Sequence, residues 1–405
     1  MLALHDICNK LEKYKASVAS SLPEIDDLDA ASKSLLQRYI NTTESTDPSS
    51  LIRIQAIIDY MYEKINIGNW KEVKLFIRKA ITIATYLKLL AHVKFSAEDS
   101  DTMIKQAFKI IDFGILFGCP LDKEPQLLQN CASILSSVNV QQSTQIFKDS
   151  PKRNSHITNN TATEASKFNA TPIEIIDCPS MEHFYRNYIL MEKPVILDNC
   201  VNHWPALEKW KDQNYFINLA GPRTVSIEIG SKYTDTDWTQ KLITIEEFIK
   251  QYIYQTEGPT GYLAQYQLFD QIPELKNDIT EPEYCCFSDS NDPVDVMAWY
   301  GPKGTVSPLH HDPKRNLLTQ VVGEKQLFLF APSDSQHLYP HEHELLNNTA
   351  QVDPRQPDLD KYHKYKSAKP YYCILKPGQM LYIPPKWWHF VESLSISFSV
   401  SFWWE

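Results

Sequence analysis

The C-terminal end of the chain carries a run in which apolar and polar side chains alternate strictly. Residues 396–402 read Ile-Ser-Phe-Ser-Val-Ser-Phe. Successive side chains of a β-strand point to opposite faces, so this period of two is typical of a half-buried strand. Shorter apolar runs precede it at residues 297–300, 317–322, 326–330, 372–375, 380–383 and 388–391. Many short strands at this spacing favour a barrel or a jelly roll, with helical insertions near residues 244–254 and 268–275.

The first part of the chain shows a different period. Apolar residues between positions 50 and 147 recur three and four residues apart, as in Leu51, Ile54 and Ile58. This is the spacing of one face of a helix. A later periodic run stops at Gly118, and glycine is common just after a helix end. We therefore predict an all-α N-terminal domain over residues 1–148, which stabilises the protein or docks a partner.

Residues 149–170 separate the two regions. This stretch, DSPKRNSHITNNTATEASKFNA, is poor in apolar residues and rich in Ser, Thr, Asn and Ala. Such a composition indicates a flexible linker. The predicted organisation is therefore α+β, with a helical domain over 1–148, a linker over 149–170 and a strand-rich domain over 171–405.

Composition and charge exclude several classes of protein. The net charge of −10 argues against general nucleic-acid binding, which requires a basic surface, and suits a basic protein partner. No apolar run approaches the roughly 18 residues of a membrane span, and the N-terminus lacks the apolar core of a signal peptide. None of the 8 cysteines forms a C-x-x-C pair. We therefore expect reduced thiols, no structural zinc site, and an intracellular protein of the nucleus, the cytoplasm or both.

The motif SPLHHDP, at residues 307–313, carries the strongest chemical signal. Residues two apart on a strand point the same way, so His310 and Asp312 can bind one metal ion. A third ligand is expected from PGQMLYIPPKWWH, where a Pro-Gly turn launches a strand and His389 opens the next one. Two imidazoles and one carboxylate leave open positions on the metal, which is the ligand set of non-haem Fe(II) oxygenases.

Other histidines compete for this role. His311 adjoins the two proximal ligands but faces the opposite side of a strand. We interpret it as a residue behind the ligands or on the substrate side, with simple packing as the alternative. His337, His341 and His343 form a second cluster. The Pro, Glu and Asn residues around them indicate an exposed loop, and no pattern of carboxylates or cysteines completes a zinc site there.

An oxygenase with this ligand set also holds a dicarboxylate co-substrate, whose far carboxylate needs a cation and hydroxyl donors. Lys325 follows a hairpin turn and begins a strand on which Leu327 and Leu329 share its side. A lysine beside a turn is usually exposed, but the metal motif favours an inward position for this one. The candidate co-donors are Tyr262, Ser307 and Asn316.

Four segments together resemble a Jumonji-C (JmjC) domain: HHDP, the GEK hairpin, PGQMLYIPPKWWHFV and the terminal SISFSVSFWW. The resemblance covers residues 171–405, and the ligand residues show no departure from the family pattern. It implies a double-stranded β-helix (a cupin-like jelly roll), with Fe(II) on His310, Asp312 and His389, and with 2-oxoglutarate and O2 as co-substrates. It also implies that 2-oxoglutarate binds Lys325 and lies near Tyr262, Ser307, Asn316 and Trp403.

The resemblance favours hydroxylation of arginine side chains in a basic protein, such as a histone or a ribosomal or chromatin-associated protein. A guanidinium needs planar carboxylate recognition and often stacks on aromatic rings. The substrate residues that we predict on this basis are Glu228, Trp238, Trp299 and Gln265. Similar acidic and aromatic residues suit a histone methyl-lysine demethylase, in which hydroxylation of an N-methyl group releases formaldehyde. The sequence leaves both substrates open.

Two further classes of protein also stay open. One is a metal-binding cupin scaffold without activity, against which Lys325 and the intact ligand set argue. The other is a histone-tail peptidase. The chain shows no Ser/His/Asp or Cys/His arrangement and no H-E-x-x-H motif, so hydrolysis would have to rest on the three metal ligands.

Overall fold

The computed structural model describes residues 2–41, 48–69, 72–139, 161–230, 238–255, 258–343 and 346–405. The chain divides into two compact units. The first contains Met1–Gln145 with the short segments Ile217–Val225 and Asp270–Ile272, and the second contains the rest. Residues 149–160 of the predicted linker lie outside the described residues, and the residues that follow form helix α8 (Thr161–Lys167).

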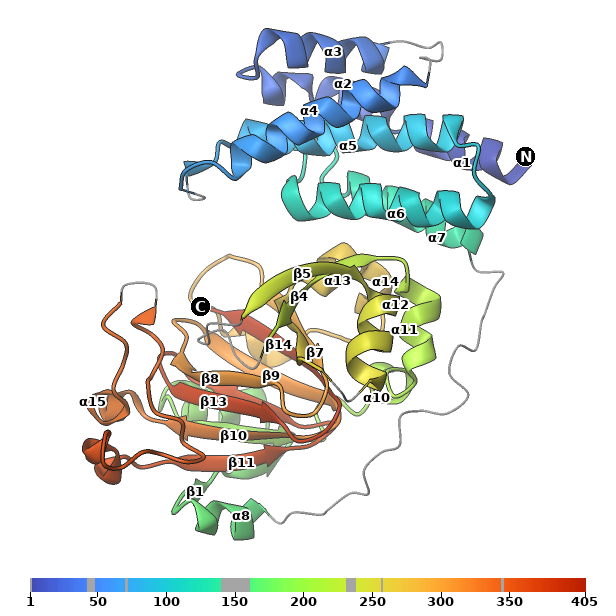
Figure 1. The fold of residues 1–405 in the computed structure, drawn as a ribbon. Coiled ribbons are helices and arrows are strands. Elements are labelled where there is room, and N and C mark those ends of the chain that lie inside the picture. The colour runs from blue at the N-terminus through green and yellow to red at the C-terminus, as the bar shows by residue number, and fades with distance from the viewer. Residues whose placement is uncertain are drawn as a thin grey trace. The chain divides into compact units, whose positions relative to one another are not determined.

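The first unit is helical, as predicted. Its helices are α1 (Leu2–Glu12), α2 (Lys15–Ser20), the 3-10 helix η1 (Leu22–Ile25), α3 (Ala30–Asn41), α4 (Ser49–Ile65), α5 (Leu75–Phe95), α6 (Ser100–Phe117) and α7 (Leu127–Asn139). α5 is buried on nearly all sides and packs against α1, α4 and α6, so it forms the centre of this unit (Figure 1). The predicted helix end is confirmed, because α6 stops directly before Gly118. A Cβ atom on Gly118 would lie 2.3 Å from Thr82 Oγ1, so a larger residue does not fit there.

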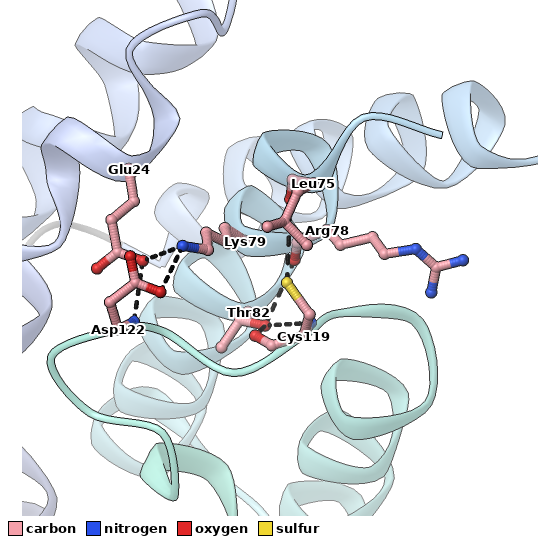
Figure 2. Close-up of polar contacts among 7 residues, drawn as sticks. All are labelled: Glu24, Leu75, Arg78, Lys79, Thr82, Cys119 and Asp122. Atoms are coloured by element: carbon pink, nitrogen blue, oxygen red, sulfur yellow. Dashed lines mark hydrogen bonds and ion pairs between the residues drawn. The ribbon is translucent and has the colours of Figure 1, made fainter. Parts of the chain in front are cut away.

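An ion-pair cluster around the buried Lys79 ties three elements of the first unit together, and its Asp122 side chain is exposed (Figure 2). Lys79 Nζ of α5 lies 2.8 Å from Glu24 Oε2 in η1 and 2.8 Å from Asp122 Oδ1 in the connection between α6 and α7. Beside this cluster, Thr82 Oγ1 donates to the carbonyl oxygen of Cys119 at 2.7 Å and accepts from its N–H at 3.1 Å. These bonds hold the loop that follows α6 against α5.

The second unit is a jelly roll of two sheets, which confirms the predicted double-stranded β-helix. One sheet has the strand order β1-β11-β10-β13-β8, and the other has the order β2-β3-β12-β9-β14-β7-β6-β4-β5 (Figure 1). An apolar cluster takes inward-facing side chains from both sheets, among them Leu327 and Leu329 of β10 and Leu381 and Ile383 of β12. The strands are β1 (Thr171–Pro172), β2 (Ile175–Asp177), β3 (Val195–Asp198), β4 (Thr224–Ile229), β5 (Thr239–Thr244), β6 (Gly261–Tyr266), β7 (Asp295–Gly301), β8 (Val306–His311), β9 (Arg315–Val322), β10 (Lys325–Phe330), β11 (Tyr371–Leu375), β12 (Met380–Ile383), β13 (Trp388–Ser393) and β14 (Ser397–Trp404).

Short helices decorate the sheets. Both predicted insertions are helical: α12 (Ile245–Phe248) runs into the π-helix η4 (Ile249–Tyr254), and α13 (Leu268–Gln271) precedes α14 (Pro273–Lys276). α12 begins with a capping box, in which Thr244 and Glu247 each bind the other's backbone N–H. The remaining short helices are α9 (Met181–Phe184), η3 (Tyr185–Ile189), α10 (Ala206–Lys209), α11 (Gln213–Ala220), η5 (Glu283–Cys286), η6 (Pro332–Asp334), α15 (Ser335–Leu338) and η8 (His363–Ser367).

The alternating C-terminal run forms β14, between β9 and β7, but both of its faces are buried. On the apolar face, Phe398 packs against the ring of Trp210, with 4.5 Å between centroids. On the serine face, Ser399 Oγ donates to Gln320 Oε1 at 2.7 Å, and Trp299 Nε1 donates to Ser401 Oγ at 2.8 Å. The expectation of a half-buried strand is therefore wrong, since side chains of neighbouring strands take the place of water as hydrogen-bond partners of the serines.

No helix among the described residues combines the length and the apolar character that crossing a bilayer requires.

Candidate metal centre

The three predicted metal ligands come together where β8 pairs with β13. In this antiparallel ladder His310 lies directly opposite His389, and the centroids of the two rings are 4.2 Å apart. Asp312 follows the end of β8, and its Oδ2 lies 3.8 Å from His310 Nε2 and 3.5 Å from His389 Nε2. Within the described part of the chain, these three residues form the only group of three or more candidate ligands close enough to share one ion.

Backbone contacts orient both imidazoles towards this point. His310 Nδ1 lies 2.7 Å from the carbonyl oxygen of Pro308, and His389 Nδ1 lies 3.0 Å from that of Trp387. A proton on Nδ1 satisfies each carbonyl and leaves the Nε2 lone pair available to a metal. Burial, and next the neighbouring His310, lower the pKa of His389 to about 4, so this ring is neutral, as a ligand must be.

The donor set fits a divalent metal. The buried Oδ2 of Asp312 accepts no hydrogen bond in the structure, although a buried carboxylate oxygen normally has a partner. The same oxygen lies between the two Nε2 atoms. A ligand set of two histidines and one carboxylate leaves room for other molecules on the metal.

A cavity with an empty volume of ≈ 350 Å³ adjoins the ligands. The co-substrate residues predicted from the resemblance all lie in its wall, as does one predicted substrate residue: Lys325, Tyr262, Ser307, Asn316, Trp403 and Trp299. Sequence reasoning missed three apolar wall residues, Leu318, Ile383 and Val391. Val391 could have been found, since it lies two residues after His389 on the same strand and so points the same way.

Lys325 supplies the positive charge of this cavity. Its side chain is 1% exposed, and its Nζ donates to the hydroxyl of Tyr262 at 3.2 Å. Burial lowers the pKa of Lys325 to about 7, and no carboxylate of the described residues forms an ion pair with it. Two further polar atoms of the wall, Asn316 Oδ1 and Trp403 Nε1, are buried without a hydrogen-bond partner. The cavity therefore offers a cation and unpaired polar groups to a small anionic ligand.

The other predicted substrate residues lie outside the cavity wall. Glu228 of β4 pairs with Tyr262 of β6, and Trp238 Nε1 donates to Glu228 Oε2 at 3.3 Å. Burial raises the pKa of Glu228. Gln265 is exposed, with a left-handed φ of 46°, where the pairing of β6 with β7 shifts register.

The competing histidines lie elsewhere. The ring of His311 packs edge-on against Trp388, with 4.6 Å between centroids, on the side of β8 away from His310. His337 Nδ1 lies 3.2 Å from Asp334 Oδ1. The backbone N–H of His341 donates to the carbonyl oxygen of Thr349 at 2.9 Å.

The fold and this centre together define a cupin-type protein with a candidate site for a mononuclear metal. Comparison with known proteins shows to which family of cupin-type proteins the chain belongs. The family model for the Cupin-like domain matches residues 181–405. Lysine-specific demethylase 8 of Danio rerio is 41% identical over 371 residues, which is 89% of this chain and 89% of the relative. Jumonji C domain-containing protein 5 of Drosophila melanogaster is 40% identical over 359 residues, or 87% of this chain and 86% of the relative.

A third relative, lysine-specific demethylase JMJ30 of Arabidopsis thaliana, is 45% identical over 227 residues, which cover 56% of this chain and 53% of the relative. The chain belongs to the Jumonji-C family of 2-oxoglutarate oxygenases, as the sequence motifs predicted.

Proposed function

We propose that this protein is an Fe(II)- and 2-oxoglutarate-dependent oxygenase that hydroxylates arginine side chains of a basic protein. The observation that carries the oxygenase assignment is Lys325, a buried ammonium in the same cavity as the three metal ligands. A buried cation without an acidic partner is stabilised when an anionic ligand joins it. The dicarboxylate 2-oxoglutarate supplies such a group.

The protein side chains have distinct roles in this proposal. His310, Asp312 and His389 would hold the iron, which when bound supplies the oxidative chemistry together with O2 and 2-oxoglutarate. Lys325 and the hydroxyl of Tyr262 would bind the far carboxylate of the co-substrate and so fix its orientation. The apolar wall residues Leu318, Ile383 and Val391 would exclude water from the reacting groups.

Glu228 supports arginine as the substrate. Its carboxylate is half-buried, and burial raises its pKa, which makes the charged form less favourable unless a cation joins it. A guanidinium remains charged in this setting, binds a carboxylate through two parallel hydrogen bonds and stacks on flat rings. The indoles of Trp238, bonded to Glu228, and of Trp299, in the cavity wall, offer such rings.

The second candidate function is demethylation of methyl-lysine in a histone. It is favoured by the names of relatives, since the proteins of Danio rerio and Xenopus tropicalis are called lysine-specific demethylase 8. The same acidic and aromatic side chains can receive a methylated ammonium. Both candidate functions imply a protein substrate, and we place the enzyme in the nucleus, the cytoplasm or both.

One experiment separates these candidates. The full chain is incubated with Fe(II), 2-oxoglutarate and O2 and with paired basic peptides that carry arginine or methyl-lysine at the same position. We expect the arginine peptide to gain one oxygen atom in the mass spectrum. Loss of a methyl group from the methyl-lysine peptide alone would favour the demethylase instead. The Asp312→Ala variant is the control and should modify neither peptide.

The inactive scaffold is tested in the same reaction. Succinate formation from 2-oxoglutarate by the wild-type chain, and its absence in Asp312→Ala, would exclude a scaffold without activity. If the wild-type chain forms no succinate with either peptide, the oxygenase proposal fails as a whole. If succinate forms but neither peptide changes, only the substrate part of the proposal fails.

A further inference from the structure

Two cysteines lie side by side at the ends of neighbouring strands, at the edge of the larger sheet. β2 and β3 pair in parallel, with Asp177 opposite Asp198. Cys178 directly follows Asp177, and its backbone N–H donates to the carbonyl oxygen of Asp198 at 2.9 Å. Cys200 lies two residues after Asp198. The strand pairing therefore brings the two thiols together, although α9 and η3 separate them in the sequence.

The hydroxyl of Tyr284, in η5, contacts both thiols. Its oxygen is 3.9 Å from Cys178 Sγ and 3.7 Å from Cys200 Sγ. The hydroxyl donates its own proton to the carbonyl oxygen of Pro179 at 2.7 Å, so towards the thiols it can only accept. Both sulfur atoms therefore contact the same oxygen atom, and neither cysteine forms a disulfide.

The two thiols differ in their access to solvent. Cys178 is exposed, and its backbone has a φ of 22°, in the left-handed region that L residues rarely adopt. Cys200 is half-buried, and its single thiol proton can be donated either to Tyr284 or to the carbonyl oxygen of Asp198, which lies 3.5 Å from its sulfur. Burial, and next the contact with Cys178, raise the pKa of Cys200 to about 12. Reagents in solution therefore meet Cys178 first, while Cys200 is held behind it as a protonated thiol.

We propose that Cys178 and Cys200 are a site of reversible oxidation, at which a hydroperoxide converts the two thiols into an intramolecular disulfide. The sulfur of Cys178 attacks the peroxide, the O–O bond breaks, and Cys178 becomes a sulfenic acid while one water leaves. The sulfur of Cys200 then attacks that of Cys178, and the S–OH oxygen leaves with the thiol proton as a second water. Two thiols and one hydrogen peroxide thus give one disulfide and two waters.

The ligands near the two cysteines argue against a metal site there. A soft metal such as zinc takes four ligands in a structural site. Across the described ranges, no group of three or more metal-ligating side chains other than His310, Asp312 and His389 comes close enough to share an ion. The thiol pair therefore lacks the further ligands that a structural zinc needs.

Peptide mapping tests the proposal directly. The full chain, without added iron, is treated with hydrogen peroxide, its remaining thiols are blocked with N-ethylmaleimide, and trypsin digests it without reduction. Arg186 lies between the two cysteines, so trypsin separates them unless a disulfide joins the two peptides. We expect a linked Cys178–Cys200 peptide that is two hydrogen atoms lighter than the free pair and disappears with dithiothreitol. The Cys200→Ser variant should form no such link and should accumulate sulfenic acid on Cys178.

Cys286 provides the matched control. It is another exposed cysteine, two residues from Tyr284 in the same short helix. Cys286→Ser should form the Cys178–Cys200 link to the same extent as the wild-type chain. The proposal is overturned if peroxide oxidises Cys178 to the sulfinic acid without a link in the wild-type chain, if it links Cys178 to Cys286, or if it leaves both cysteines alkylated. None of these outcomes bears on the oxygenase function, whose residues lie elsewhere.

Discussion

The ammonium of Lys325 donates a hydrogen bond to the hydroxyl of Tyr262 at 3.2 Å, and both side chains line the cavity beside the metal ligands. Lys325 begins β10 in the smaller sheet, and Tyr262 belongs to β6 in the larger one, so this bond joins the two sheets. A buried ammonium that donates to a neutral hydroxyl and forms no ion pair among the described residues destabilises the ligand-free fold. An anion in the cavity would reverse that effect.

Replacing Lys325 by Met should therefore weaken 2-oxoglutarate binding without unfolding the protein. Loss of one charged partner in a buried site costs about 3 kcal/mol of binding free energy, or roughly a hundredfold in Kd. Calorimetric titration with 2-oxoglutarate, in the presence of Mn(II) in place of iron, measures the change. Lys376→Met, at an exposed lysine in the turn between β11 and β12, is the control and should bind like wild type. Equal affinities for all three proteins would refute the assigned role.

The stability of the ligand-free protein should depend on pH through the same lysine. Burial lowers the pKa of Lys325 from 10.5 to about 7. Between these values the unfolded chain holds a proton on the amine that the folded chain has lost, so stability rises with pH in this window. The destabilisation caused by the buried charge is absent at a pH above the pKa of the unfolded chain. It is complete at a pH below the pKa of the folded chain. The Tm of Lys325→Met should thus exceed that of wild type most at pH 7 and should approach it near pH 10. A gap in Tm that stays constant over this range would contradict the buried, depressed lysine.

Binding of a divalent metal to the metal centre should raise the thermal stability of the protein. A metal that binds only the folded state adds about 2.7 kcal/mol of stability when its concentration is a hundredfold above Kd. We expect Mn(II) or Co(II) to raise the Tm of the wild-type chain by several degrees and EDTA to abolish the rise. Asp312→Ala should show no rise. Asp295→Ala removes a carboxylate that pairs with Lys314 outside the centre, and this variant should respond as wild type does.

The sequence predicted the local features of the centre but not how they meet. The period of a strand predicted that His310 and Asp312 lie on one side, and it placed Lys325 on the side of Leu327 and Leu329. The inward direction of Lys325 was predicted from the metal motif, since a lysine beside a turn is usually exposed. The pairing of β8 with β13, which sets His389 opposite His310, joins strands that are far apart in the chain. No local period contains that pairing. The PGQMLYIPPKWWH motif proposed His389 as the third ligand, and the family resemblance implied the fold that brings it to the other two.

The error at β14 has a similar origin. A period of two shows that a strand has two chemically different faces, but it does not show what covers each face. Ser399 and Ser401 face the buried Gln320 and the half-buried Trp299, contributed by the neighbouring strands β9 and β7. Because polar side chains from other strands complete these hydrogen bonds, the serine face does not need water. That outcome depends on the order of strands in the sheet, which the alternation itself cannot specify.

Glu228 offers a test of substrate recognition that is separate from co-substrate binding. Glu228→Gln keeps the size of the side chain and its bond from Trp238 but removes the negative charge. We expect KM for an arginine peptide to rise about tenfold or more, because a charged hydrogen-bonded pair becomes a neutral one. The affinity for 2-oxoglutarate should stay unchanged, since Lys325 holds that ligand. An unchanged KM would remove Glu228 from the substrate site, whereas a weaker affinity for 2-oxoglutarate would place it with the co-substrate instead.

The ion pairs of the helical unit should differ in their contribution to the unfolding free energy according to their burial. Lys79 is 7% exposed and neutralises Glu24, so Lys79→Met leaves a carboxylate in a largely buried position without its cation (Figure 2). Such an unpaired charge costs about 2–3 kcal/mol of unfolding free energy. The matched control is Lys105→Met, which removes an exposed i,i+4 pair with Asp101 and should cost less than about 0.5 kcal/mol. Urea unfolding followed by circular dichroism measures both changes. If Lys79→Met is no more destabilising than Lys105→Met, the cluster in Figure 2 does not hold η1 and the loop after α6 to α5.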